Sequence, residues 1–416
     1  LDAWDSCVPF LITNNVVIAE QYATAIYLLV KGLCEQKQFD LTQPLPIIEL
    51  GAGHGRFAFL VLKSLMPMLT AYNPKIKLLY ILTDYAKRNI EFWQDQPQLS
   101  AFVENKTLDF ALFDLDHPEK PIVGNISNKT INTSNPLVLF ANYIIDTIAS
   151  DYYSFTQDQM NWATLTTTTD KKNIKQGGPK DFSEINYTID YTACPRKNDA
   201  PNFMQSIWSH YQKLQLKHIP IPEIFLNALN ILVDQGHEKL FLIASDHGYT
   251  NLDELKIASP PELKRHHSFS IMVNFDAISH YFTYKKGRGY TGQKTDQGLK
   301  TCFFSLNMDT DAMTDLTTHM RQVTDRFNAA DFLELIKPLK DKSNKNLSSW
   351  ISLLKLCDWD PIIFQRYKKY IHKLLKEHMN DSEHKNSFWH NSLVASLTAG
   401  LERTTYWFYF MPNKNA

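Results

Sequence analysis

Apolar positions along the first part of the chain follow two different periods. Between Asn15 and Leu33 they recur at steps of three and four residues, which predicts an amphipathic helix. Helical periodicity returns at 56–69, where Pro67 is expected to end the helix, and at 86–94. Short continuous apolar runs predict buried strands; they span 44–50, 77–84, 136–142 and 239–245. Strands that alternate with helices indicate a mostly parallel sheet with helices on both faces.

The pattern changes after the third predicted strand. Residues 151–156 and 162–169 mix aromatic, polar and threonine side chains as a β-hairpin does. Lys, Asn, Gly and Pro dominate 170–201, which we interpret as a surface insertion without regular structure. Beyond it, the pattern predicts a helical segment and two late strands: 202–235, 268–275 and 300–306.

Only helical patterns follow Asp315. We therefore expect a first domain at 1–310, with an N-terminal helix and an insertion around 150–235, and a helical C-terminal extension at 311–416. The end of the extension, YWFYFMPNKNA, has the aromatic-and-small composition of the first helix of a tetratricopeptide repeat. The extension is expected to pack on the first domain or to form a substrate-binding surface.

The stretch 47–57, IIELGAGHGRF, joins a predicted buried strand to a predicted helix. Such a strand, glycine-rich turn and helix is the layout in which doubly wound sheets hold nucleotides. Gly51, Gly53 and Gly55 allow positive φ and let a ligand approach the backbone. A dinucleotide fingerprint would place its third glycine at position 56, which is Arg56 here. That difference disfavours an NAD-dependent oxidoreductase.

Glu49 followed by three glycines at alternate positions resembles motif I of the S-adenosylmethionine-dependent class I methyltransferases. The resemblance implies a Rossmann-like fold, S-adenosylmethionine as cofactor, and a glycine turn under its methionine part. Asp84 ends the next predicted strand, where a carboxylate can accept both ribose hydroxyls of an adenosine. Asp109 and Phe110 follow a further β-like stretch and are candidates for contacts with the adenine amino group and ring.

Further segments across residues 9–306 resemble the MidA-like methyltransferases in their order and spacing. They are IAEQYATAIYLLV, IIELGAGHGRFAFLVL, ILTDYAKRNIEFWQ, LVLFANYIIDTIASDYYSF, LFLIASDHGY, SFSIMVNFDAISHYF and TDQGLKTCFF. This family is related to a mitochondrial complex I assembly factor that methylates an arginine on a protein subunit. The resemblance implies a protein or peptide substrate, with arginine or another nitrogen as the methyl acceptor.

The substrate half departs from the family's pattern more than the cofactor half does. Where the family has Asn-Glu-x-x-Asp-Ala-Leu-Pro, this chain has Asn142 and Asp146, which match, but Tyr143 replaces the glutamate. The family's Asp-Tyr-Gly and Val-Asp-Phe motifs carry His247 and Asn274 here. Asn142 and Asp146 are the candidate catalytic residues, and they can equally be a helix cap and a solvated acid. A guanidinium substrate favours two carboxylates, and Tyr143 removes the expected second one.

Other polar residues near the predicted strand ends have two interpretations each. His54 and Arg56 can contact a ligand carboxylate or remain solvated loop residues. Asp246 and His247 follow a strand's carboxyl end, where ligands of such sheets bind, or form a simple capped turn.

Composition narrows the class of protein. The net charge of −1 argues against a dedicated binder of nucleic acid or of anionic membranes. The five cysteines are scattered without a CxxC pair, which fits a reducing compartment and gives no metal site. No apolar run approaches the ~18–20 residues that a membrane-spanning helix needs. We expect a cytoplasmic protein that binds neither nucleic acid nor membrane.

Two other functions remain open beside a methyltransferase that acts on a protein. The first is a non-catalytic assembly or adaptor protein with a degenerate methyltransferase fold, which the altered segment NYIIDTIAS suggests. The second is a methyltransferase that acts on a small molecule in a closed apolar pocket. An oligomeric state does not follow from the sequence.

Overall fold

The computed structural model describes residues 14–131, 133–169, 185–194, 199–258, 260, 271–292, 298–340 and 346–380. The largest element in them is a sheet in the order β11-β12-β9-β4-β1-β2-β3, with the short β10 paired to β9. Its strands are β1 Leu45–Leu50, β2 Leu78–Asp84, β3 Leu108–Leu112, β4 Leu137–Asn142, β9 Leu240–Tyr249, β10 Val273–Asn274, β11 Arg288–Tyr290 and β12 Leu299–Leu306. Neighbouring strands run parallel except where β12 pairs antiparallel with β9 and β11. This topology confirms the predicted Rossmann-like class I methyltransferase fold.

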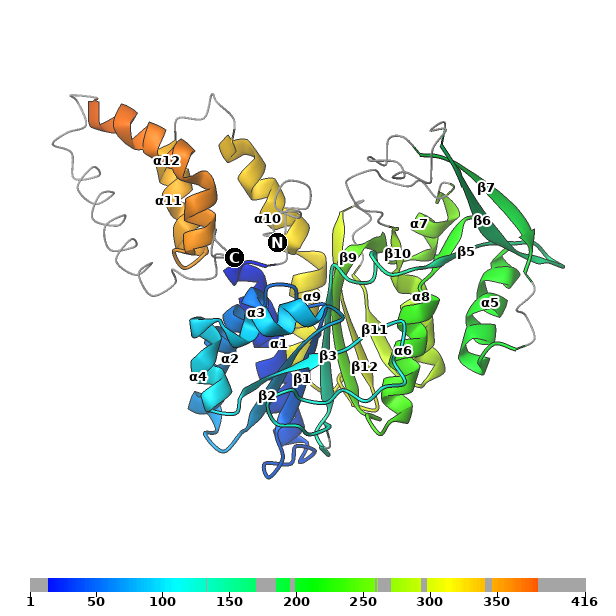
Figure 1. Cartoon of the computed structure of the whole chain (residues 1–416), viewed down its shortest axis with the longest axis horizontal. Helices are drawn as coiled ribbons and strands as arrows, with labels where there is room; N and C mark the ends of the chain where they lie inside the picture. The colour runs from blue at the N-terminus through cyan, green and yellow to red at the C-terminus, as the bar shows by residue number, and fades with distance from the viewer. Residues whose placement is uncertain are drawn as a thin grey trace.

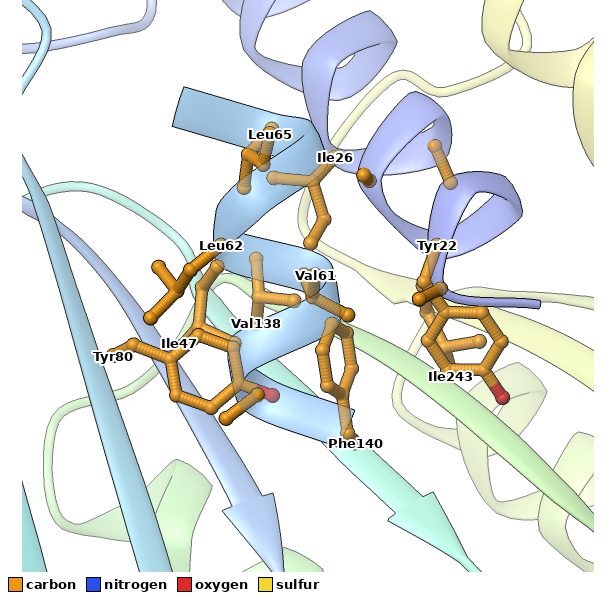
Figure 2. Close-up of a cluster of buried hydrophobic side chains, with 14 of the residues drawn as sticks. Tyr22, Ile26, Ile47, Val61, Leu62, Leu65, Tyr80, Val138, Phe140 and Ile243 are labelled. Atoms are coloured by element: carbon orange, nitrogen blue, oxygen red, sulfur yellow. The ribbon is translucent and has the colours of Figure 1, made fainter. Parts of the chain in front are cut away.

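Helices cover both faces of this sheet because alternate residues of the buried strands point to opposite sides (Figure 1). The helices are α1 Val16–Glu35, α2 Arg56–Tyr72, α3 Lys87–Gln94, α4 Pro97–Glu104, α5 Asn202–Leu214, α6 Glu223–Asp234, α7 Leu252–Lys256, α8 Phe275–Tyr284 and α9 Thr314–Asp325. In β1, Ile47 belongs to the core under α1 and α2, and Ile48 to the core under α6 and α8. Figure 2 shows Ile26 of α1 and Leu65 of α2 above Ile47 and its strand neighbours.

A second, antiparallel sheet has the order β7-β6-β5-β8. Its strands are β5 Asp151–Phe155, β6 Met160–Thr168, β7 Asn186–Ala193 and β8 Ile219–Ile221. The pairing of β5 with β6 confirms the predicted hairpin. The prediction of irregular structure over 170–201 was wrong for β7, which pairs with β6 along its length, and its parts at 170–184 and 195–198 lie outside the described residues. In the segment predicted as helical at 202–235, α5 and α6 are separated by the non-helical residues 215–222, which include β8 paired with β5.

The C-terminal helices form a third buried cluster, built around Trp350 and Tyr367. They are α10 Ala329–Ile336, the 3₁₀ turn η5 Lys337–Lys340, α11 Leu347–Leu356 and α12 Pro361–Asn380. The preceding helix α9 packs instead against α1 and belongs to the core of the large sheet. The domain boundary near residue 310 remains a prediction, and the tetratricopeptide-like end lies outside the described residues.

Among the described helices, α1 has the length and composition of a membrane-spanning segment. In the fold, 61% of its apolar window is buried, and it packs against α2 and α9. The sequence prediction had excluded any such segment on the length of its apolar runs. The burial of α1 accounts for its apolar composition without a membrane.

Three predictions about element ends were wrong. The helix expected to end at Pro67 continues to Tyr72, because the exposed Pro67 is tolerated within α2 at the cost of one backbone hydrogen bond. Asp109 does not follow its strand but lies inside it, since β3 spans Leu108–Leu112. Of the strand expected at 268–275, the described part holds β10, and α8 begins at Phe275.

The interior proline gives a direct test of the α2 assignment. Pro67→Ala restores an N–H that can donate to the carbonyl of Lys63 and removes the clash of the proline ring with that turn. We expect the free energy of unfolding to rise by roughly 1–3 kcal/mol, measured by chemical denaturation. A loss of stability would contradict a continuous helix through this position.

Candidate functional site

The candidate site lies where β1 and β4 lie side by side in the large sheet. From β1 the chain runs outward to β2 and β3 and then returns to β4 on the other side of β1. At such a switch point the loops after the two strands diverge, and ligands of open α/β sheets bind in the resulting crevice. The glycine turn follows β1 here, and the segment Asn142–Asp146 begins at the end of β4.

The glycine turn has the backbone conformation that the sequence predicts. Gly51, Gly53 and Gly55 have φ values of 59°, 57° and 73°, in the left-handed region that favours glycine. A Cβ on Gly51 would lie 2.6 Å from Cδ1 of Ile144. This glycine therefore lets the segment Asn142–Asp146, called the β4 segment below, approach the turn closely. Among the described residues, a Cβ on Gly53 would meet no atom within 4 Å apart from those of its own chain neighbours. The turn therefore presents open space directly beside the backbone of Gly53.

Asp84, at the end of β2, lies against the same turn. Its Oδ2 accepts hydrogen bonds from the backbone N–H of Gly53 at 3.3 Å and from Nδ2 of Asn89 at 2.8 Å. Trp93 of α3 donates its indole N–H to the carbonyl of Gly53 at 2.9 Å. The structure thus brings together the glycine turn and the carboxylate predicted to hold a ribose.

Two exposed apolar side chains lie beside Asp84 and were missed in the sequence. Tyr85 directly follows Asp84 in the chain and is 75% exposed. Leu112 of β3 pairs with Asp84 in the β2–β3 register and is 57% exposed. Large apolar side chains at the carboxyl end of a sheet are suited to cover a flat aromatic ligand. The position of Tyr85, next to the acidic residue, was the available sequence signal.

Asp109 and Phe110 point to opposite faces of the sheet. The Asp109 carboxylate accepts N–H bonds from Ile126 at 3.0 Å and Ser127 at 3.1 Å, and it fixes the loop that carries them. The Phe110 ring is buried against Trp93 at a centroid distance of 5.7 Å. The structure therefore does not bring this pair together at the glycine turn, and their contact with an adenine remains a prediction.

Glu49 lies below the turn within the core. Its Oε2 accepts a 2.6 Å hydrogen bond from the hydroxyl of Tyr80, and only 5% of the residue is exposed. Burial raises the pKa of Glu49 to about 8, so the carboxyl is largely protonated at neutral pH. The hydrogen bond to Tyr80 joins Glu49 of β1 to β2 within the core. A contact of Glu49 with a cofactor remains a prediction.

Asn142 is held in a hydrogen-bonded chain that crosses three strands and α1. Its Oδ1 accepts from the hydroxyl of Tyr22 at 2.7 Å, and that hydroxyl lies 2.8 Å from Oγ of Ser245. Ser245 in turn lies 2.6 Å from Oγ1 of Thr301. Because Oδ1 of Asn142 is the acceptor, its amide nitrogen is oriented as a donor. A donor amide at this place can orient an acceptor atom of a substrate.

Asp146, in the turn after β4, and Asp246, in β9, form a buried pair of acids. Asp246 and His247 were expected to follow their strand, but both lie within β9, which continues to Tyr249. Oδ2 of Asp246 accepts from the backbone N–H of Ile145 at 3.1 Å and of Asp146 at 3.0 Å. Burial raises the pKa of Asp146 to about 6, and burial together with the Asp146 charge raises the pKa of Asp246 well above its usual range. The pair therefore retains a proton near neutral pH, as two adjacent carboxyls do. Within the described part of the chain, Oδ1 of Asp146 has no hydrogen-bond partner.

Tyr143 lies next to this acid pair in a strained conformation. Its φ of 52° is in the left-handed region, which costs a non-glycine residue of order 1 kcal/mol. Burial, followed by the charges of Asp246 and Asp146, raises the pKa of its hydroxyl. Its ring centroid lies 6.3 Å from that of His247. The structure therefore brings Tyr143, Asp146, Asp246 and His247 together, although their sequence positions differ by about 100.

His54 and Arg56 do not present a cation to the open space beside Gly53. Burial lowers the pKa of His54 to about 4, so its ring is neutral at pH 7. Arg56 is buried, and its guanidinium donates to the carbonyl of Asn14 at 2.6 Å and to the carboxylate of Asp360. Within the described residues no group of three or more His, Cys, Asp or Glu could hold a metal ion.

No protein-family model and no curated protein matches this chain. Among solved structures, it is similar to a COG1565 superfamily member from Burkholderia thailandensis bound to S-adenosyl-homocysteine, with 11% identity and a TM-score of 0.41 over 67% of this chain and 64% of that one. A second COG1565 superfamily protein from that organism has 10% identity and a TM-score of 0.39, over 66% and 65% of the two chains. Magnesium protoporphyrin IX methyltransferase from Synechocystis PCC 6803 has 8% identity and a TM-score of 0.30, over 70% and 84%.

The chain therefore spans slightly less than two thirds of the first two of these structures. Similarity at this level carries no argument about function. The fold assignment depends on the strand order of the large sheet and on its one antiparallel strand.

The acid pair makes stability depend on pH. Because the pKa of folded Asp146 is raised above 3.8, the folded state binds this proton more tightly than the unfolded chain does. The free energy of unfolding should therefore fall as pH rises from about 4 through about 6. Asp146→Asn should remove part of this fall and raise stability at pH 7.5 by roughly 1–3 kcal/mol, measured by denaturation across pH.

The exposed Asp116→Asn is the matched control and should keep the wild-type pH profile. A pH profile that is unchanged in Asp146→Asn would show that the two acids are not buried together.

Proposed function

We propose that this protein is an S-adenosylmethionine-dependent methyltransferase of the MidA-like kind, which acts in the cytoplasm on a protein side chain. The observation that carries the proposal is the open space beside Gly53, bounded by the carboxylate of Asp84 at the switch point of the sheet. A nucleoside with two adjacent hydroxyls and a flexible polar arm fits this combination of groups.

The described residues fit the cofactor as follows. The backbone of Gly51–Gly55 would lie under its methionine part, where no Cβ fills the space at Gly53. Asp84 would accept the ribose hydroxyls, and Tyr85 and Leu112 would cover the adenine. When bound, S-adenosylmethionine supplies a methyl group on a positively charged sulfur. The protein's own task is then to orient the acceptor atom toward that methyl group.

The β4 segment supplies groups for the acceptor. Oδ1 of Asn142 accepts from Tyr22 and has a second lone pair that can accept from an N–H of the substrate. Asp146, with a pKa of about 6, can accept a proton from a nitrogen near neutral pH. Asp246 lies beside Asp146 as a fully buried carboxyl with a raised pKa, so it does not replace the glutamate that Tyr143 removes. A proton acceptor such as Asp146 supports a nitrogen as the methyl acceptor, in an arginine or another protein side chain.

Binding of the cofactor tests the proposal. We expect S-adenosylmethionine and S-adenosylhomocysteine to bind the wild type with micromolar dissociation constants in calorimetry. Gly53→Ala should weaken binding at least 30-fold, because its new Cβ points into the space for the ligand. Gly236→Ala is the matched control, since Gly236 also has positive φ and open surroundings but lies between α6 and β9. A well-folded wild type that binds neither compound would contradict the proposal.

Transfer of the methyl group separates an enzyme from an adaptor protein. With tritiated S-adenosylmethionine, the wild type should label a protein in a cell extract, and Asp146→Asn should lower the rate at least tenfold without changing cofactor affinity. Labelling of small molecules alone would favour the small-molecule methyltransferase. Cofactor binding without labelling of any extract fraction would favour the adaptor.

A further inference from the structure

An ion pair joins the glycine turn to the C-terminal helices. Arg56, the first residue of α2, binds the carboxylate of Asp360, which directly precedes α12. Arg56 is 2% exposed and Asp360 is fully buried. Asp360 also accepts from the backbone N–H of Ile362 at 3.0 Å, so it fixes the start of α12. The pair thus connects the beginnings of two helices that lie 304 residues apart in the chain.

This arrangement is unfavourable in electrostatic terms unless both partners are present. A cation in the first turn of a helix opposes the positive end of the helix dipole, so Arg56 at the start of α2 needs a nearby anion. Moving both charges from water into the protein interior is costly, and a pair of well-packed apolar residues of similar size would often stabilise the folded state at least as much as a buried ion pair does. A buried pair of this kind is better explained by the geometry that it fixes than by the stability that it adds.

The geometry that Arg56 fixes is that of the turn. Gly55 is the N-cap of α2, so Arg56 is the residue through which the turn enters the helix. The backbone N–H of Arg56 donates to Nδ1 of His54 at 3.4 Å, and its guanidinium holds Asn14 through the main-chain carbonyl and the side chain. On the other side, Asp84 holds Gly53. The turn is therefore fixed from one side by β2 and from the other by the C-terminal helices.

Away from this pair the contact between α2 and the C-terminal helices is looser. Lys63 and Asp358 form a second ion pair at 2.9 Å, but their side chains are 40% and 45% exposed. An open groove of about 370 Å³ is lined by residues of α1 and α2, and Asp358 is the residue that the C-terminal turn adds to its lining. Figure 1 shows α11 and α12 on the side of the molecule opposite the second sheet, away from other strands. Apolar contacts also join these parts, through Ile362 of α12 and Val17 of α1. The ion pair of Arg56 and Asp360 is a buried polar contact that connects the start of α12 to the turn itself.

We propose that the C-terminal helices α11 and α12 hold the glycine turn in its ligand-binding conformation, with Asp360 as a positioning residue that acts through Arg56. Anything that moves α12 would then change the affinity of the site after β1 for its ligand. The cofactor part of the test depends on the proposed function, and the amide-exchange part does not.

The test compares two carboxylates of the same loop. Asp360→Asn removes the buried anion, and Asp358→Asn removes the exposed one as the matched control. In Asp360→Asn we expect amide hydrogens of residues 53–57 to exchange at least tenfold faster, and S-adenosylhomocysteine to bind at least fivefold more weakly. In Asp358→Asn both quantities should stay within twofold of the wild type. Asp360→Glu, which keeps the charge, should recover part of both losses.

The outcomes separate the two proposals. Faster exchange at the turn in Asp360→Asn supports the inference even if the wild type binds no S-adenosylhomocysteine, a result that would overturn only the proposed function. A folded Asp360→Asn protein with unchanged exchange and affinity would overturn the inference. If Asp360→Asn does not fold, Asp360→Glu decides, because its longer side chain shifts the guanidinium of Arg56 while keeping the charge. Exchange at the turn faster than in the wild type, with weaker binding, would support the inference, and wild-type values of both would overturn it.

Discussion

The left-handed backbone of the glycine turn is the constraint on which the rest of the site depends. Three alternate residues with positive φ let the chain leave β1, pass close to Ile144 and enter α2 within five residues. Side chains there would be strained, and a Cβ at Gly51 would collide with the β4 segment. The same turn leaves its outer side open at Gly53, so the ligand space is a consequence of the backbone path rather than of a deep cavity.

The groups around this turn divide into two sets with different electrostatics. Asp84 is stabilised by donors from Gly53 and Asn89, and it suits hydroxyl groups of a ligand. Asp146 and Asp246 are buried side by side: Asp246 keeps a proton, and Asp146, with a pKa of about 6, can accept one from an approaching group. Asp84 ends β2 and Asp146 follows β4, the strands on either side of β1, and under the proposed function the two sets would serve the cofactor and the methyl acceptor.

The sequence predicts the parts of this site that depend on local patterns. Apolar runs identify β1, β2 and β4, and glycine spacing identifies the turn, so Asp84 and Asn142 were found from their places at strand ends. Contacts between distant segments have no such signal: Asp246 lies 100 residues from Asp146, and Asp360 lies 304 residues from Arg56. β7 was missed because its side chains are mostly polar and half-buried or exposed, without the apolar run of a core strand. The carboxylate of Asp109 is used by a loop that no local pattern connects to β3.

The central claim is that the turn after β1 holds a nucleoside by its backbone and by Asp84. The most direct measurement is a crystal structure of the protein grown with saturating S-adenosylhomocysteine. We expect density for the ligand across Gly51–Gly55, with the ribose hydroxyls within hydrogen-bond distance of the Asp84 carboxylate and the adenine between Tyr85 and Leu112. Ligand density at any other place, with the turn empty, would contradict the account.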